Sequence, residues 1–105
     1  MLILERPYFE ELLDILAFVL KKRCPARVYA FGSRVKGGEV KKFADIDLAL
    51  LAPEGKVPDE VLAKLRDHFS VSDIPYRVDI IDLNRVSASF KAAIEKDLLE
   101  ISYMP

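Results

Sequence analysis

The sequence predicts a mixed α/β domain in which helices cover a small β-sheet. Short runs rich in β-branched and aromatic residues alternate with longer segments whose apolar residues recur at helical spacing. Turn signals containing Gly or Pro separate these segments. The 105 residues show no internal repeat, low-complexity tract or linker, so we expect a single domain over residues 1–105.

The first helix is predicted over residues 7–23. Pro7 suits the first turn of a helix, and Pro25 stops it. The three basic residues at positions 21–23 suit the negative end of the helix dipole. Its inner face is expected to comprise Phe9, Leu12, Leu13, Leu16, Val19 and Leu20.

Short β-forming runs predict the strands. The first is Arg27–Phe31, and the second is Ile46–Leu51, which is followed by the turn signal Pro53-Glu54-Gly55. The third covers residues 77–83, and a short fourth strand is expected over residues 99–103. Because strands and helices alternate, the strands should form one small mixed sheet.

Two further helices complete the pattern. One starts at Pro58 and runs to about Phe69, with an apolar inner face. The other follows Ser87, whose hydroxyl can cap its first turn. We expect that last helix to bury an inner face made of Val86, Phe90, Ala93, Ile94 and Leu98.

Composition excludes several classes of protein. With 16 basic and 17 acidic residues, no overall field attracts the chain to DNA, RNA or a membrane surface. The single cysteine, Cys24, cannot form an internal disulfide, and the apolar stretch over residues 15–20 is too short to span a bilayer. The acidic N-terminus does not read as a signal peptide, so the expected compartment is the cytoplasm.

Asp45 and Asp47 flank an isoleucine at the start of the second strand. Residues two apart in a strand point to the same face, so the two carboxylates should lie together, opposite the core-facing Ile46, Leu48 and Leu50. Adjacent carboxylates raise each other's pKa unless a cation neutralises them. A hard divalent cation such as Mg²⁺, which prefers oxygen ligands, is the natural partner.

A third carboxylate, Asp79, interrupts the apolar third strand. A charge inside such a run is costly to bury unless it is paired or bound to a metal. If the third strand lies beside the second, Asp79 comes level with Asp47, and three such carboxylates suit a site for two metal ions. Asp82 competes for this role, but charges at a strand end are common, so we favour Asp79.

The first strand ends in Gly32-Ser33. Glycine lets a phosphate approach the backbone closely, and a helical turn after it would offer free N–H groups. The Ser33 hydroxyl can donate to a phosphate oxygen, and Arg34 and Lys36 can add positive charge. The lysines at positions 41 and 42 could do the same, although a solvated loop is the simpler interpretation. A phosphate cradle followed by a metal pair is what nucleotidyl transfer needs.

This order of motifs resembles the nucleotidyltransferases of the DNA polymerase β superfamily. Their signature is a Gly-Ser pair after a strand, a basic loop with a glycine, Asp-x-Asp on the next strand and a third acid on a later strand. The matching residues are Phe31-Gly32-Ser33-Arg34, Lys36-Gly37, Asp45-Ile46-Asp47-Leu48 and Val78-Asp79-Ile80. The length and the stretch Pro75-Tyr76-Arg77-Val78-Asp79 resemble the minimal nucleotidyltransferases, or MNT domains, which are commonly encoded beside a HEPN-domain protein.

The resemblance implies a DNA polymerase β-like fold and a role for each matched residue. Gly32 and Ser33 would hold the triphosphate, and the neighbouring Arg34 would contact phosphate. The aspartates of the Asp-x-Asp motif, Asp45 and Asp47, would bind both of two Mg²⁺ ions. The third acid, Asp79, would complete the catalytic metal site and help to deprotonate the attacking hydroxyl.

The resemblance also implies a substrate and a partner. In MNT–HEPN pairs the HEPN protein resembles an RNase toxin, and the MNT protein is an antitoxin that transfers AMP from ATP to a tyrosine of the toxin. We therefore expect ATP as substrate and a HEPN toxin as partner. So short a chain has no separate region to bind an acceptor, which favours an acceptor that arrives on another protein. The base preference and the oligomeric state stay open.

Two features depart from the family pattern. The segment 34–44 between Ser33 and Asp45 is one residue longer than usual, and we place the extra residue at Gly37-Gly38. Ala44 stands where a serine often precedes the first aspartate. Neither change removes a ligand, but both affect the loop that shapes the nucleotide pocket.

Two other functions stay open. The chain could be a non-catalytic module that binds nucleotide or neutralises its partner by contact, although the complete set of three aspartates disfavours this. It could also transfer a nucleotide to a small molecule or an RNA end with the help of a separate acceptor-binding subunit. RNA is disfavoured because the sequence has no basic stripe.

Overall fold

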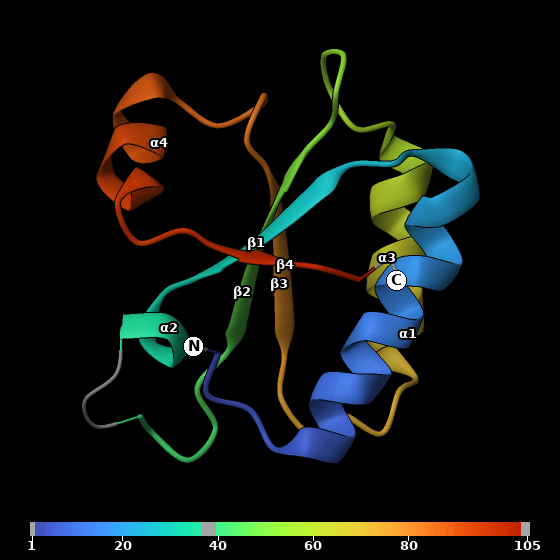
Figure 1. The fold of residues 1–105 in the computed structure, drawn as a ribbon, viewed down its shortest axis with the longest axis vertical. Helices are drawn as coiled ribbons and strands as arrows, with labels where there is room; N and C mark the ends of the chain where they lie inside the picture. Colours follow the sequence, from blue (N-terminus) through green and yellow to red (C-terminus); the bar gives the residue numbers. More distant parts are fainter. Residues whose placement is uncertain (1, 37–39, 104–105) are drawn as a thin grey trace.

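The computed structural model describes residues 2–36 and 40–103 of the chain. In these ranges four helices are interleaved with four strands (Figure 1). In chain order they are α1 (Arg6–Arg23), β1 (Arg27–Phe31), α2 (Ser33–Lys36), β2 (Ile46–Leu51), α3 (Asp59–Ser70), β3 (Val78–Asp82), α4 (Ala88–Glu95) and β4 (Leu99–Ile101). Gly37 and Gly38, where the sequence places the extra loop residue, lie outside the described residues.

The strands form one mixed sheet in the order β3-β2-β1-β4. β1 pairs antiparallel with β2 and with β4, whereas β2 and β3 run parallel. A parallel pair needs a crossover connection, and α3 supplies it. The predicted fold class, a small mixed sheet with covering helices, is confirmed.

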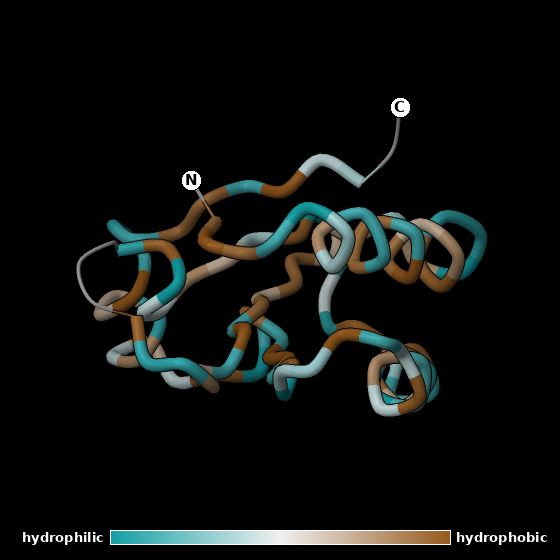
Figure 2. Tube along the Cα trace, turned by 90° about the horizontal axis from the view of Figure 1, so that it is seen from below, coloured by the Kyte–Doolittle hydropathy of each residue, from teal (hydrophilic) through white to brown (hydrophobic). Residues whose placement is uncertain are grey.

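Helices α1 and α3 pack against each other and against one face of the sheet. Figure 2 shows both on one side of the molecule, with α2 and α4 on the other. We call the sheet face under α1 and α3 the covered face; its residues include Val28, Ala30, Ile46, Leu48, Leu50 and Ile80. The alternate residues form the open face, namely Tyr29, Phe31, Asp47, Ala49, Leu51, Asp79 and Ile81.

The local signals in the sequence act largely as predicted. Strands Arg27–Phe31 and Ile46–Leu51 are confirmed, and β3 and β4 are shorter than the predicted 77–83 and 99–103. Ser87 caps α4, because its hydroxyl oxygen accepts a hydrogen bond from the Phe90 N–H at 3.1 Å. Within residues 2–36 and 40–103, no helix combines the length and the apolar character needed to cross a bilayer.

The predicted inner face of the last helix is wrong. Helix α4 has no buried residue: Phe90 is 42% exposed, and Ala93 is exposed as well. The Phe90 ring meets Phe31 edge to face at a centroid distance of 6.5 Å. In Figure 1 α4 lies well away from α1 and α3, so the core does not cover its apolar stripe. Helical periodicity shows that a stripe exists but not what covers it.

Candidate active site

The sheet register brings the predicted carboxylates to one end of the open face. Asp47 on β2 is paired with Asp79 on β3, as predicted. Asp45 lies one residue before β2, two residues from Asp47 along extended chain. Asp47 is half-buried, whereas Asp45 and Asp79 are exposed. A deep carboxylate therefore lies between two that solvent can reach.

The central carboxylate, Asp47, is affected by its burial and by its two neighbours. Burial raises the pKa of Asp47 above its usual value, and the negative charges of Asp79 and Asp45 raise it further. A cation bound among them would remove this repulsion. Three carboxylates form an all-oxygen donor set, which suits a hard cation such as Mg²⁺.

The three side chains are neighbours, but they do not converge as they stand. Among the residues that the structure describes, no group of three Asp, Glu, His or Cys side chains is arranged to hold a metal ion. Asp45 and Asp79 are exposed, so other rotamers are open to them without displacing core atoms. The donor chemistry therefore fits a metal, and the two exposed aspartates are free to turn toward Asp47.

Gly32 lies directly against the Asp47 carboxylate. Its φ of +84° falls in the left-handed region that favours glycine. A Cβ atom added at Gly32 would overlap Oδ2 of Asp47 and would lie 3.3 Å from its Cγ. Any side chain at this position would clash with the carboxylate, so glycine is the residue that lets the Asp47 carboxylate lie directly against the backbone of the turn.

A single helical turn, α2, follows the glycine as predicted. The N–H groups of Val35 and Lys36 donate to the Gly32 carbonyl at 3.1 and 3.2 Å. Ser33 is exposed at the start of this turn, so its hydroxyl is accessible beside Gly32. Lys36 pairs with Asp97 at 3.5 Å, and the lysines at positions 41 and 42 are exposed, which agrees with a solvated loop.

Arg34, predicted to contact phosphate, is instead buried in the protein. Only 4% of it is exposed. Its Nε donates to the Ala44 carbonyl at 2.9 Å and its Nη1 to the Ile3 carbonyl at 2.8 Å. The guanidinium carbon also lies 3.9 Å from the centre of the Tyr76 ring. These contacts give Arg34 an internal role that the Gly-Ser motif alone does not reveal.

Asp82, the competing third acid, also has an internal role. It is 3% exposed, and its carboxylate accepts hydrogen bonds from the Val57 N–H at 2.7 Å and the Asn84 N–H at 2.8 Å. Arg85 lies 3.8 Å away. Asp79 was expected to be the acid that burial penalises, but Asp82 is the buried one and Asp79 is exposed. Asp79 is level with Asp47 because the β2–β3 register pairs them, and both lie on the open face.

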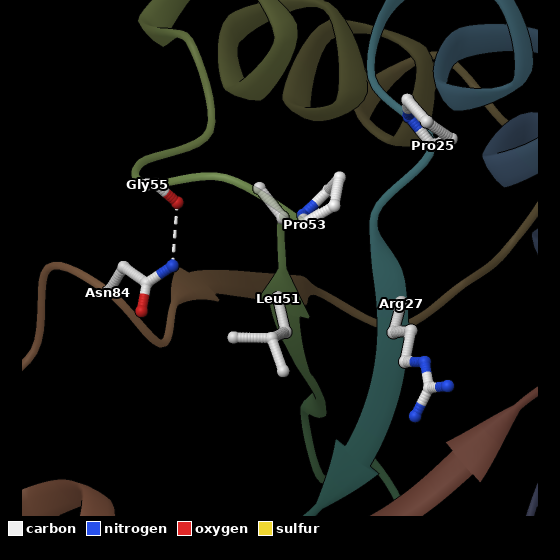
Figure 3. Close-up of a pocket in the computed structure, with 7 residues that line it drawn as sticks. Pro25, Arg27, Leu51, Pro53, Gly55 and Asn84 are labelled. Carbon is white, nitrogen blue, oxygen red and sulfur yellow. Dashed lines mark hydrogen bonds between the residues drawn. The ribbon is translucent and has the colours of Figure 1, made fainter.

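A hollow of about 510 Å³ lies at the other end of β1 and β2 (Figure 3). Its lining residues are Pro25, Arg27, Leu51, Ala52, Pro53, Gly55 and Asn84. None of these seven carries a carboxylate, and the Asn84 amide donates to the Gly55 carbonyl at 2.6 Å. Arg27 pairs with Leu51 at this end, whereas Phe31 pairs with Asp47 at the opposite end. The hollow is therefore separate from the carboxylates.

Residues 14–101 match the family described as Polymerase beta, Nucleotidyltransferase. The chain belongs to this family. The matched span contains the Gly-Ser turn, the Asp-x-Asp motif and the third aspartate. The nucleotidyltransferase class of enzyme and the polymerase β-like fold, both predicted from the sequence, are confirmed.

Relatives of this nucleotidyltransferase support the MNT resemblance. A Haemophilus influenzae protein named "Probable protein adenylyltransferase MntA" is 43% identical over 89 residues, covering 82% of this chain and 75% of that protein. A mutant of the toxin-antitoxin MntA-HpeT has a chain of the same fold, with a TM-score of 0.67 and 20% identity over 94% of this chain and 72% of that one. The structure of a toxin-antitoxin with AMP-PNP has a TM-score of 0.63 and 22% identity, over 84% of this chain and 70% of that one. The structure of a tri-AMPylated Shewanella oneidensis HEPN toxin in complex with MNT antitoxin has a TM-score of 0.59 and 20% identity, over 88% of this chain and 70% of that one.

Proposed function

We propose that this chain is a Mg²⁺-dependent protein adenylyltransferase that transfers AMP from ATP to a tyrosine hydroxyl of a HEPN toxin and thereby acts as its antitoxin. The observation that carries the proposal is the meeting of Asp47, Asp79 and Gly32 at one end of the open face. The name of the 43% identical relative supports a protein acceptor. The AMP-PNP complex and the AMPylated HEPN toxin among the fold relatives support the nucleotide and the class of partner.

Each site residue has a proposed part in the reaction. The tyrosine oxygen forms a bond to the α-phosphorus of ATP while the bond to pyrophosphate breaks, and the hydroxyl proton passes to Asp79. The Ser33 hydroxyl and the backbone at Gly32 hold the triphosphate. Asp45, Asp47 and Asp79 would hold two Mg²⁺ ions, which when bound neutralise the triphosphate and polarise its oxygens.

The test is transfer of labelled AMP, from ATP labelled at the α-phosphate, to a purified HEPN-domain protein. Wild type is compared with the double variant Asp45→Asn, Asp47→Asn, and with Asp14→Asn, an exposed carboxylate on α1, as the matched control. We expect label on the partner with wild type and with Asp14→Asn. The double variant should lose at least about 100-fold in rate, because metal-assisted charge stabilisation contributes several kcal/mol.

Other outcomes separate the alternatives. A tight complex without label in any reaction would overturn the adenylyltransferase proposal and favour neutralisation by contact. Label on RNA ends, with none on the HEPN protein, would favour a different acceptor for the same site. Equal labelling by wild type and the double variant would remove the aspartates from the mechanism.

A further inference from the structure

Arg34 is buried, and within the described residues no carboxylate forms an ion pair with its guanidinium. Burying a charge is costly unless hydrogen bonds or a counter-charge compensate. Here two main-chain carbonyls, those of Ala44 and Ile3, accept from it at 2.9 and 2.8 Å, and the Tyr76 ring covers its face at 3.9 Å. Arginine suits such a site because its planar fork donates in fixed directions and stacks on aromatic rings.

Two of these partners, Ala44 and Tyr76, lie in segments that carry the carboxylates of the candidate active site. Arg34 itself follows Gly32-Ser33 on α2. Ala44 precedes Asp45, the first carboxylate. Tyr76 lies just before the strand that carries Asp79, and the chain beside it is fixed where the Ile46 N–H donates to the Arg77 carbonyl at 2.9 Å. One side chain therefore connects the phosphate turn to the segments that carry the carboxylates.

The same side chain also holds the N-terminal segment, residues 2–5. Ile3 accepts a hydrogen bond from the Arg34 side chain and donates its own N–H to the Arg34 carbonyl at 2.7 Å. The Tyr76 hydroxyl donates to the Glu5 carboxylate at 2.7 Å. The negative charge of Glu5 thus lies at the hydroxyl end of the ring on which Arg34 stacks. The N-terminal segment therefore contacts both Arg34 and Tyr76.

We propose that Arg34 is a positioning residue that fixes the spacing between the Gly32-Ser33 turn and the aspartates, and that it does not contact the triphosphate. This inference rests on the proposed function for its effect on catalysis. Loss of the contact should therefore lower kcat, because the turn and the carboxylates lose their mutual register. The KM for ATP should change little, because no phosphate contact is removed.

The test uses Arg34→Lys, Tyr76→Leu and the double variant. Lysine keeps the positive charge but not the planar fork, and leucine removes the ring beneath the guanidinium. Arg85→Lys is the matched control, because Arg85 is also partly buried but contacts Asp59 and Asp82 at the far end of β3. We expect kcat to fall at least tenfold in each single variant, with the KM for ATP within threefold of wild type.

The double variant should be no slower than the slower single variant, since both substitutions disrupt the same stacking contact between Arg34 and Tyr76. A raised KM with unchanged kcat in Arg34→Lys, and wild-type behaviour of Tyr76→Leu, would overturn the proposal in favour of a phosphate contact. If Arg34→Lys fails to fold, the same comparison between Tyr76→Leu and Arg85→Lys decides the question.

Amide hydrogen exchange gives a readout that needs no transfer activity. In Arg34→Lys the N–H groups of Ile3 and Ala44 should exchange at least tenfold faster, while those of β1 and β2 stay protected. Unchanged exchange at both would overturn the positioning role whether or not the chain transfers AMP. Faster exchange in a chain whose wild type is inactive would uphold the positioning role and reject the proposed function.

Discussion

The two faces of the sheet are built from the same strands but serve different purposes. On β2, Leu48 faces α1 and α3 and is fully buried, whereas the preceding Asp47 lies on the open face and is half-buried. On β3, Ile80 and Ile81 show the same contrast. Strand alternation lets one short segment supply core contacts on one side and carboxylates on the other. Stability is therefore concentrated on the covered face, which leaves the open face free to hold repelling charges.

The adjacent isoleucines of β3 give the most direct test of this contrast. Ile80 is 3% exposed on the covered face, so Ile80→Ala should lower the free energy of unfolding by about 2–5 kcal/mol. Ile81 is half-buried on the open face, and Ile81→Ala should cost less than half as much. Urea unfolding of both variants measures the difference, and equal losses would show that α4 covers the open face more fully than the contacts indicate.

The two aspartates of β3 should separate stability from activity. Asp82→Asn weakens charge-assisted hydrogen bonds from two backbone N–H groups and should lower the free energy of unfolding by about 1.5–3 kcal/mol, with transfer per folded molecule retained. Asp79→Asn should change stability by less than about 0.5 kcal/mol, because Asp79 is exposed. Its transfer rate should fall at least about 100-fold, equivalent to about 2.7 kcal/mol.

Chemical denaturation and labelled-ATP transfer, measured on the same preparations, check both halves of this prediction. The reverse pattern, in which Asp82→Asn abolishes transfer without loss of stability, would transfer the third-acid role to Asp82. Loss of both properties in both variants would mean that the open face contributes to the core.

The sequence predicted the elements better than it predicted their surroundings. The strands Arg27–Phe31 and Ile46–Leu51 were found as predicted because Gly, Pro and Asp residues mark the ends of short β-forming runs. The predicted burial of the apolar stripe on α4 was wrong because periodicity is a local property, whereas burial depends on where the helix lies relative to α1 and α3. The level position of Asp47 and Asp79 was predicted on the assumption that the third strand lies beside the second, and the register confirms it.

Arg34 shows the same limit within the candidate site. A basic residue after Gly-Ser suggests a phosphate ligand, and local sequence offers no contrary signal. Its actual partners, the Ile3 carbonyl and the Tyr76 ring, are remote in sequence and come together only in the fold. Asp82 was judged ordinary for a related reason, since the N–H of Val57 that it accepts from belongs to a distant turn.

A small stabilising effect is predicted for a substitution of Asp47 itself. Burial and the charges of Asp79 and Asp45 raise its pKa in the folded state, so the folded protein binds its proton more tightly than the unfolded chain does. Asp47→Asn should therefore stabilise the metal-free protein near pH 7, by up to about 1 kcal/mol, the scale of ordinary single substitutions.

The sign of the pH dependence is fixed by the same argument. At low pH Asp47 is protonated in both the folded and the unfolded state. Wild type and Asp47→Asn should then differ in stability only by the exchange of a carboxylic acid for an amide. As pH rises from the ordinary value of 3.8 through the raised folded value, wild type alone acquires the buried charge, and the advantage of Asp47→Asn grows and then levels off. Saturating Mg²⁺ should reverse the difference, because a cation that binds only the folded wild type stabilises it. Thermal unfolding with Mg²⁺ and with a chelator measures both signs, and a variant that is less stable than wild type without metal would show that the open-face charges do not repel.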